Sequence, residues 1–145
     1  MTVTQYKNIL IPTDGSDYSF YAAEHAVCLA KAFGAKLYAL NVVNAPLAFH
    51  AGIHYAESMT DMEKSGQEAV KKIKALCDEK GVDCQEMIVE GDPKTAIVDV
   101  ACQVCADCIV IGSIGMSALE RVLIGSVSDS VLRHAPCPVL MVRKP

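Results

Sequence analysis

Glycine and serine residues follow an apolar run near the C-terminal end of the chain. The run, Cys108–Ile111, leads directly into Gly112, and two residues separate Gly112 from Gly115. Nine residues separate Gly115 from the pair Gly125 and Ser126, which opens a helical pattern. Polyphosphates bind at sites of this kind, where a buried strand is followed by glycines and by the start of a helix.

Main-chain N–H groups would supply most of the phosphate contacts in such a site. Glycines let the main chain approach an anion closely, and the first N–H groups of a helix have no internal acceptor. Ser113, Ser126 and Ser128 would add hydroxyl donors. A structural role alone would need only one glycine after the strand and one small residue at the helix start, so two glycine clusters favour phosphate binding.

Two better-known phosphate motifs are absent. A P-loop requires a lysine followed by serine or threonine after its last glycine, whereas Gly125 is followed by Ser126 and Val127. The dinucleotide fingerprint G-x-G-x-x-G does not occur either. Because no motif lysine offsets the phosphate charge, we expect a divalent cation, Mg²⁺ or Mn²⁺, which prefers hard oxygen ligands.

The glycine spacing resembles the nucleotide motif of the universal stress protein family, in its ATP-binding branch. The opening Ile9–Ser16 (ILIPTDGS) and the ending Ala135–Val142 (APCPVLMV) are similar to the first and last strands of that family. The resemblance therefore covers the whole chain. It implies a stress-response or signalling module that binds ATP, or AMP or ADP, with an unknown signalling partner.

The resemblance also implies which residues contact the nucleotide. Asp14 follows the first strand, where open α/β sheets bind ligands, but on local grounds it is equally a turn or capping residue. Val42 would flank the adenine, although its position alone suggests a core residue. The expected nucleotide contacts are Pro12, Thr13, Asp14, Gly15, Val42, Gly112, Ser113, Gly115, Gly125, Ser126, Val127 and Ser128.

The glycine-rich stretch departs from the family pattern at two positions. Ile114 and Met116 stand where polar or basic residues are frequent in relatives, so phosphate contacts from those side chains are lost. The choice between ATP and AMP therefore stays open. Arg121 could reach a phosphate or face water, and we expect one helical turn between Met116 and Ile124.

Composition and charge limit the class of protein. A chain of 145 residues with 52% hydrophobic content predicts one domain over residues 1–145. The chain has 13 basic and 17 acidic residues and no basic run that could follow a phosphate backbone, which argues against nucleic acid as a partner. The polar start Met1–Lys7 and the lack of a long apolar run predict a cytoplasmic protein without a membrane span.

Apolar patterns predict alternating strands and helices, and so an α/β fold. The expected strands are Asn8–Ile11, Lys36–Val43, Gln85–Val89, Cys108–Ile111 and Val139–Val142. The four expected helices cover Ser19–Phe33, a long stretch that ends at Gly81, residues from Asp92 to Cys105, and Ser126–His134, with Phe33 and Leu132 facing inward. This alternation predicts a single-domain, doubly wound, five-stranded parallel sheet of the Rossmann-like type with flanking helices, in the order 3-2-1-4-5 if it follows the family.

Two groups of side chains could bind a metal, one of histidines and one of cysteines. His50 and His54 lie in the segment Asn44–Thr60, which we expect to be irregular and able to cover the nucleotide. Exposed loop histidines are favoured there over a metal site. Seven cysteines, an odd number, indicate reduced thiols. Cys102, Cys105 and Cys108 have iron–sulfur-like spacing, but helical periodicity favours buried core positions for the first two.

Three functional hypotheses remain from the sequence. An ATP-binding regulatory module is favoured. A slow ATPase or phosphotransferase is the second, with only Asp14 and Arg121 as candidates for the chemistry, and a thiol redox or metal protein is the third. In the family the last strand pairs across a two-fold axis, so the resemblance implies a homodimer through Val139–Val142.

Overall fold

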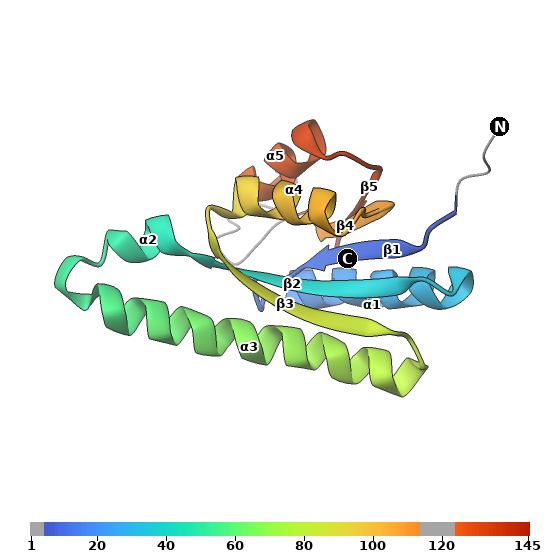
Figure 1. The fold of residues 1–145 in the computed structure, drawn as a ribbon, viewed down its shortest axis with the longest axis horizontal. Helices are drawn as coiled ribbons and strands as arrows, with labels where there is room; N and C mark the ends of the chain where they lie inside the picture. The colour runs from blue at the N-terminus through green and yellow to red at the C-terminus, as the bar shows by residue number, and fades with distance from the viewer. Residues whose placement is uncertain (1–4, 114–123) are drawn as a thin grey trace.

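The computed structural model describes residues 5–113 and 124–145, and its centre is one parallel sheet (Figure 1). Along the sheet the strand order is β3-β2-β1-β4-β5, which confirms the expected order. Gly115, Met116 and Arg121 lie outside the described residues. The strands are β1 (Asn8–Pro12), β2 (Lys36–Asn44), β3 (Cys84–Gly91), β4 (Cys108–Gly112) and β5 (Val139–Val142).

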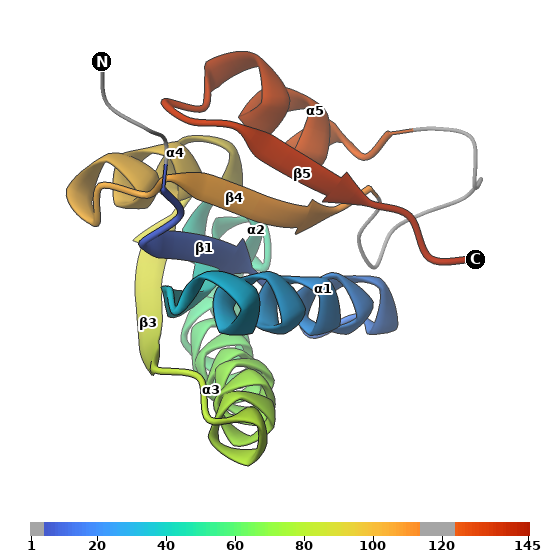
Figure 2. The same cartoon turned by 90° about the vertical axis from the view of Figure 1, so that its right-hand side faces the viewer.

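Helices cover both faces of the sheet. Figure 2 shows α1 and α3 on one face and α4 and α5 on the other. No helix in the described ranges combines the length and apolar character needed to cross a membrane. The helical elements are α1 (Asp17–Phe33), α2 (Ala45–Phe49), η1 (Gly52–His54), α3 (Tyr55–Lys80), α4 (Pro93–Gln103) and α5 (Ser126–His134).

Alternation along each strand divides the core into two layers. Ile9 and Ile11 pack toward α1 and α3, whereas Leu10 between them packs toward α4 and α5. In β4, Val110 joins the first layer and Ile109 joins the second. Because both faces are covered, the central strands carry continuous apolar runs, as parallel sheets require.

The segment expected to be irregular is largely helical. Its Asn44 side chain caps α2 by accepting a hydrogen bond from the Leu47 N–H at 3.1 Å, and α3 already begins at Tyr55. The described part of the chain therefore has five α-helices instead of the expected four. Periodicity could not predict α2, because a helix of five residues contains too few apolar positions to set a period.

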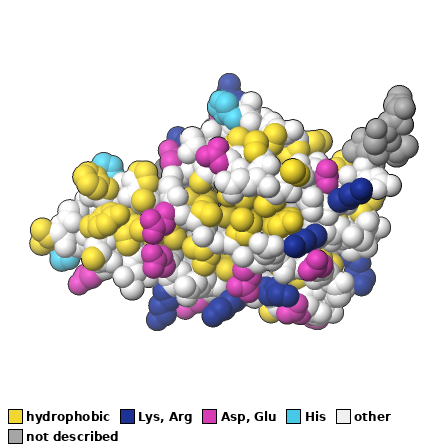
Figure 3. Space-filling model, viewed as in Figure 1, with side chains coloured by type: hydrophobic (Ala, Val, Ile, Leu, Met, Phe, Trp, Pro, Cys, Tyr) yellow, Lys and Arg dark blue, Asp and Glu magenta, His cyan; other side chains and the backbone are white. Residues whose placement is uncertain are grey.

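Large apolar side chains are exposed around α2 and η1. Phe49 is 75% exposed and Ile53 is 95% exposed, and Leu47 and Tyr55 are also exposed. Figure 3 shows hydrophobic side chains gathered at this end of the molecule, together with histidine. His50 and His54 are exposed, as expected, and the described residues contain no group of three metal-binding side chains.

Several positions expected in the core are exposed. Cys102 is exposed because it lies inside α4 but off the face that buries Ile97, Val100 and Ala101. Cys105 is exposed because α4 ends at Gln103 and Cys105 adopts a positive φ of 52° beyond it. The helical period therefore does not extend to Cys105. Phe33 is 54% exposed and stacks edge-on against Tyr6, and Leu132 on α5 is 40% exposed.

A close contact between α3 and β2 fixes one side of the sheet's carboxyl end. Asn41 is buried in β2, and its Nδ2 donates a hydrogen bond of 2.9 Å to the Thr13 carbonyl in the turn after β1. A Cβ atom added at Gly66 of α3 would lie 2.6 Å from Asn41 Cγ. Only glycine therefore lets the helix approach this buried amide.

We expect Gly66→Ala to destabilise the protein. Replacing glycine by alanine in a helix interior ordinarily stabilises the folded protein by about 1 kcal/mol. Here the added methyl group would displace Asn41, and the overpacking together with the lost hydrogen bond to Thr13 should produce a net loss of about 1–2 kcal/mol. Urea unfolding of the purified variants measures this difference.

The control for that experiment is Gln67→Ala, at the exposed neighbouring position on α3. It should change the free energy of unfolding by no more than about 0.5 kcal/mol. In an Asn41→Ala background, Gly66→Ala should no longer destabilise. A Gly66→Ala variant as stable as the starting protein would contradict the proposed close contact.

Candidate functional site

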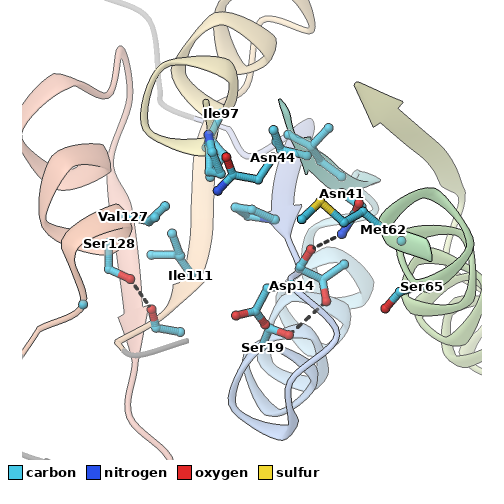
Figure 4. A pocket seen from close by; sticks show the side chains of 18 of the residues that line it. Asp14, Ser19, Asn41, Asn44, Met62, Ser65, Ile97, Ile111, Val127 and Ser128 are labelled. Carbon is cyan, nitrogen blue, oxygen red and sulfur yellow. Dashed lines mark hydrogen bonds between the residues drawn. The ribbon is translucent and has the colours of Figure 1, made fainter. Parts of the chain in front are cut away.

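A cavity of about 610 Å³ lies at the carboxyl ends of β1, β2 and β4, bounded by α3 and by the start of α5. Its size falls within the range of small-molecule sites, about 300–1,000 Å³. Figure 4 shows Ile111, Val127 and Ser128 on one side of it and Met62 and Ser65 on the other. Segments that are far apart in the sequence therefore meet at the edge where open α/β sheets bind ligands.

Most of the residues expected to contact a nucleotide lie around this single cavity. Those that line it are Pro12, Thr13, Asp14, Val42, Gly112, Gly125, Ser126, Val127 and Ser128. Gly15 and Ser113 do not line it. Gly115 lies outside the described residues.

The turn after β1 is held by hydrogen bonds centred on Thr13. The Thr13 N–H donates to the Leu40 carbonyl at 2.8 Å, which ties the turn to β2. Its hydroxyl lies 2.9 Å from the Ser19 hydroxyl and accepts a hydrogen bond from the Gly15 N–H at 3.1 Å. Since the Ser19 hydroxyl donates to the Ser16 carbonyl, Thr13 is the donor to Ser19. These bonds fix the Thr13 side chain as support for the turn.

Asp14 forms part of the turn after β1 and also lies at the cavity. Its Oδ1 accepts a hydrogen bond from the Ser16 N–H at 2.9 Å, the pattern of an Asx turn. The same residue lines the cavity and is exposed. Gly15 then takes a φ of 84°, which an L side chain rarely adopts, and this lets the chain turn into α1.

The junction of β4, β5 and α5 positions the second half of the site. The Ser113 N–H donates to the Val142 carbonyl at 3.0 Å, and the Ser113 carbonyl accepts from the Gly125 N–H at 2.7 Å. Ser113 is only 3% exposed, because these bonds hold it inside the junction. The Ser128 hydroxyl donates to the Gly112 carbonyl at 2.6 Å. Ser113 therefore stabilises the junction through its main chain, and Ser128 stabilises it through its hydroxyl.

The first turn of α5 presents main-chain N–H groups at the cavity. By helix geometry the N–H groups of residues 126–128 have no acceptor within the helix. The N-cap residue is Gly125, which has no side chain to accept from them. Ser126, Val127 and Ser128 all line the cavity. This helix start is a partly positive surface that suits an anion.

Several lining residues were not singled out as ligand contacts in the sequence. The sequence offers one signal for Asn41, which is a polar residue between the apolar residues Leu40 and Val42. The sequence offers no signal for the lining residues of α3, because only the packing of that helix on the sheet brings them to the cavity. The additional lining residues are Ser19, Leu40, Asn41, Asn44, Leu47, Asp61, Met62, Ser65, Gly66, Pro93, Ile97 and Ile111.

The cavity walls differ in chemistry. Val42, Met62, Ile97 and Ile111 give apolar surface, whereas the start of α5 gives N–H donors. Among the described lining residues there is no lysine or arginine, and Asp14 and Asp61 add negative charge. Such a cavity suits a molecule with a flat apolar part and an anionic part.

Comparison with known proteins identifies the family that the sequence motifs resemble. Residues 5–143 match the model of the Universal stress protein family. A universal stress protein of Methanocaldococcus jannaschii is 45% identical over 142 residues, which cover 97% of this chain and 84% of that protein.

Solved structures agree at the level of the fold. Universal stress protein UspA from Lactobacillus plantarum has a TM-score of 0.86 and 30% identity, covering 97% of this chain and 100% of that one. A universal stress protein solved in complex with cAMP has a TM-score of 0.71 and 29% identity, covering 96% of this chain and 98% of that one. By sequence and by structure, the chain belongs to the universal stress protein family.

Proposed function

We propose that this protein is a cytosolic nucleotide sensor that binds ATP, or AMP or ADP, in the cavity at the carboxyl ends of β1 and β4. The observation that carries the proposal is the start of α5, whose N–H groups at residues 126–128 line a cavity with apolar walls. A nucleotide has an anionic end and a flat, largely apolar base, so it matches both parts of this cavity. The relative that was solved with cAMP supports a nucleotide as the ligand class.

The phosphates would lie against the start of α5 and the turn after β4. Gly112 and Gly125 line that part of the cavity, and Gly115 would complete the set of main-chain contacts. The absence of a side chain at Gly125 leaves the N–H groups of the first turn accessible. Charge-assisted hydrogen bonds of this kind are stronger than neutral ones, which favours phosphate over an uncharged ligand.

The base would lie between β2 and α4. Val42 of β2 and Ile97 of α4 both line the cavity and provide apolar surface there. Ile97 is 3% exposed and belongs to the core layer beneath α4 and α5, so this wall is rigid. In this proposal Val42 flanks the adenine, as the family resemblance implies.

Charge balance makes a divalent cation part of the proposal. Asp14 and Asp61 line the cavity, and the described lining residues include no basic side chain to offset a triphosphate. The described residues also lack any group of three His, Cys, Asp or Glu side chains that could hold a metal. Mg²⁺ or Mn²⁺ would therefore be held chiefly by phosphate oxygens and enter together with ATP.

Binding without rapid turnover is the activity we infer. Efficient phosphoryl transfer uses cationic side chains near the transferred phosphate in addition to a metal ion, and the described lining residues include no lysine or arginine. Two measurements test this inference. Mass spectrometry of small molecules released from protein purified without added nucleotide should detect adenine nucleotide, and single-turnover incubation should leave bound ATP intact for hours. Hydrolysis within seconds would favour the ATPase alternative.

Gly125→Val should weaken ATP binding while the fold is kept. The backbone at Gly125 has φ −61° and ψ 152°, angles that valine adopts without strain, so the main effect is bulk in front of the helix start. Losing one or two charge-assisted hydrogen bonds should raise the Kd for ATP about 10- to 100-fold in calorimetry.

The matched control is Ser130→Val, on the same helix but outside the cavity. This variant should change the Kd for ATP by no more than about twofold, which corresponds to a binding free energy change well under 1 kcal/mol. Equal ATP affinity in Gly125→Val, Ser130→Val and the starting protein would show that α5 does not hold the phosphates.

Removing divalent cations should weaken ATP binding more than AMP binding. A triphosphate brings more negative charge than a monophosphate next to Asp14 and Asp61, so it depends more on a cation. In calorimetry with a chelator, the Kd for ATP should rise by about tenfold or more, while that for AMP changes less. An unchanged ATP affinity in chelator would contradict the proposed role of the cation.

We also propose that two copies pair through β5. The strand is at the edge of the sheet, and its Leu140 is 43% exposed. An exposed apolar edge strand is an unstable surface in water unless a partner covers it. Pairing across a two-fold axis would let each copy cover the other.

Leu140→Lys should therefore convert the protein to a monomer, because a lysine on an edge strand opposes strand pairing. Light scattering coupled to gel filtration measures the mass. Leu132→Lys is the matched control, since Leu132 is 40% exposed but lies on α5 outside the strand. A monomeric starting protein, or a Leu140→Lys dimer, would contradict pairing through β5.

A further inference from the structure

Two polar side chains of α3 lie at the cavity, one an acid and one a hydroxyl. Asp61 and Ser65 are four residues apart, so they are neighbours on the same side of the helix, and both line the cavity. Among the described residues, neither the Asp61 carboxylate nor the Ser65 hydroxyl forms a hydrogen bond or an ion pair. The Thr60 hydroxyl, by contrast, donates to the Ala56 carbonyl at 3.0 Å within the helix. The α3 wall therefore offers polar groups that a ligand can use.

Packing holds this part of α3 in place. On one side of the pair, Met59 is 8% exposed and belongs to a small apolar core cluster. On the other side, Gly66 lies against the buried Asn41 side chain. Asp61 and Ser65 lie between these two contacts and are themselves exposed. The backbone that carries them is therefore already ordered before a ligand binds, which lowers the cost of binding.

The stereochemistry of a nucleotide determines which of its groups would meet the α3 wall. In the proposed binding mode the base lies against α4 and the phosphates against α5, and these two helices cover the same face of the sheet. The base and the 5′ phosphate project from one side of the ribose ring, whereas the 2′ and 3′ hydroxyls project from the other side. Figure 4 shows Ser65 across the cavity from Val127 and Ser128. The two ribose hydroxyls would therefore point toward α3.

We propose that the Asp61 carboxylate accepts hydrogen bonds from the 2′ and 3′ hydroxyls of a bound nucleotide, with the Ser65 hydroxyl beside it, so that the cavity selects ribonucleotides over deoxyribonucleotides. This inference rests on the proposed nucleotide-binding function.

A carboxylate suits this role because of its hydrogen-bonding capacity. It only accepts hydrogen bonds, and its two oxygens can serve two neighbouring hydroxyl donors. Its charge strengthens both bonds. Asp14, the other acidic residue at the cavity, already accepts a hydrogen bond from the Ser16 N–H at 2.9 Å and so supports the turn after β1. Dinucleotide-binding sheets use an acidic side chain for the ribose 2′ hydroxyl in the same way.

Calorimetry with AMP, 2′-deoxy-AMP and 3′-deoxy-AMP tests the proposal on the unaltered chain. A chelator is present throughout, so that no divalent cation can link Asp61 to the phosphate. We expect the protein to bind AMP about tenfold more tightly than either deoxy analogue, because each analogue lacks one hydroxyl donor for the carboxylate. Equal affinities for the three would overturn this inference and leave the proposed function in place. Failure to bind AMP or ATP, with or without Mg²⁺, would overturn both.

Variants assign the preference to one side chain. Asp61→Ala should reduce the preference for AMP over its deoxy analogues to less than about twofold. The ratio of the Kd values is the quantity to compare, because removing a negative charge also changes the affinity for every phosphate ligand. Glu68→Ala is the matched control, since Glu68 is an exposed acid of α3 that does not line the cavity, and it should keep the full preference. A preference that persists in Asp61→Ala, or that falls equally in Glu68→Ala, would overturn the inference.

Discussion

The site depends on one constraint, the reversal of strand order between β1 and β4. From β1 the chain builds outward to β2 and β3, and from β4 it builds outward in the other direction to β5. Because connections between parallel strands are right-handed, the helix after β1 and the helix after β4 lie on opposite faces of the sheet. The two turns therefore separate and leave a crevice that side chains do not fill.

Hydrogen bonds between segments turn that crevice into a defined cavity. Asn41 links the turn after β1 to β2, and Gly66 brings α3 against the same amide. On the other side, the Ser128 hydroxyl and the Gly112 carbonyl join α5 to the end of β4. The polar side chains near the cavity thus largely support the main chain, and the main chain presents the groups that face a ligand.

The sequence predicted those parts of the structure that depend on local pattern. The five apolar runs gave the strands to within one or two residues at each end, and the glycine spacing indicated the turn and helix start at Gly112 and Gly125. It could not predict α2, which is only five residues long, or the exposure of Cys105, which lies beyond the end of α4 where helical periodicity no longer holds. Nor could it identify Asp61 or Ser65, since only the packing of α3 on β2 brings them to the cavity.

Because six distant segments of the chain form the cavity, the supply of a ligand would affect how long the protein persists. The walls come from residues between Pro12 and Ser128, so an unfolded chain retains no part of the cavity that could bind on its own. A ligand that binds only the native state stabilises it by mass action, about 2.7 kcal/mol at a concentration 100 times the Kd. Chains in a cell rich in that ligand would spend less time open to proteases, and scarcity would shorten their lifetime.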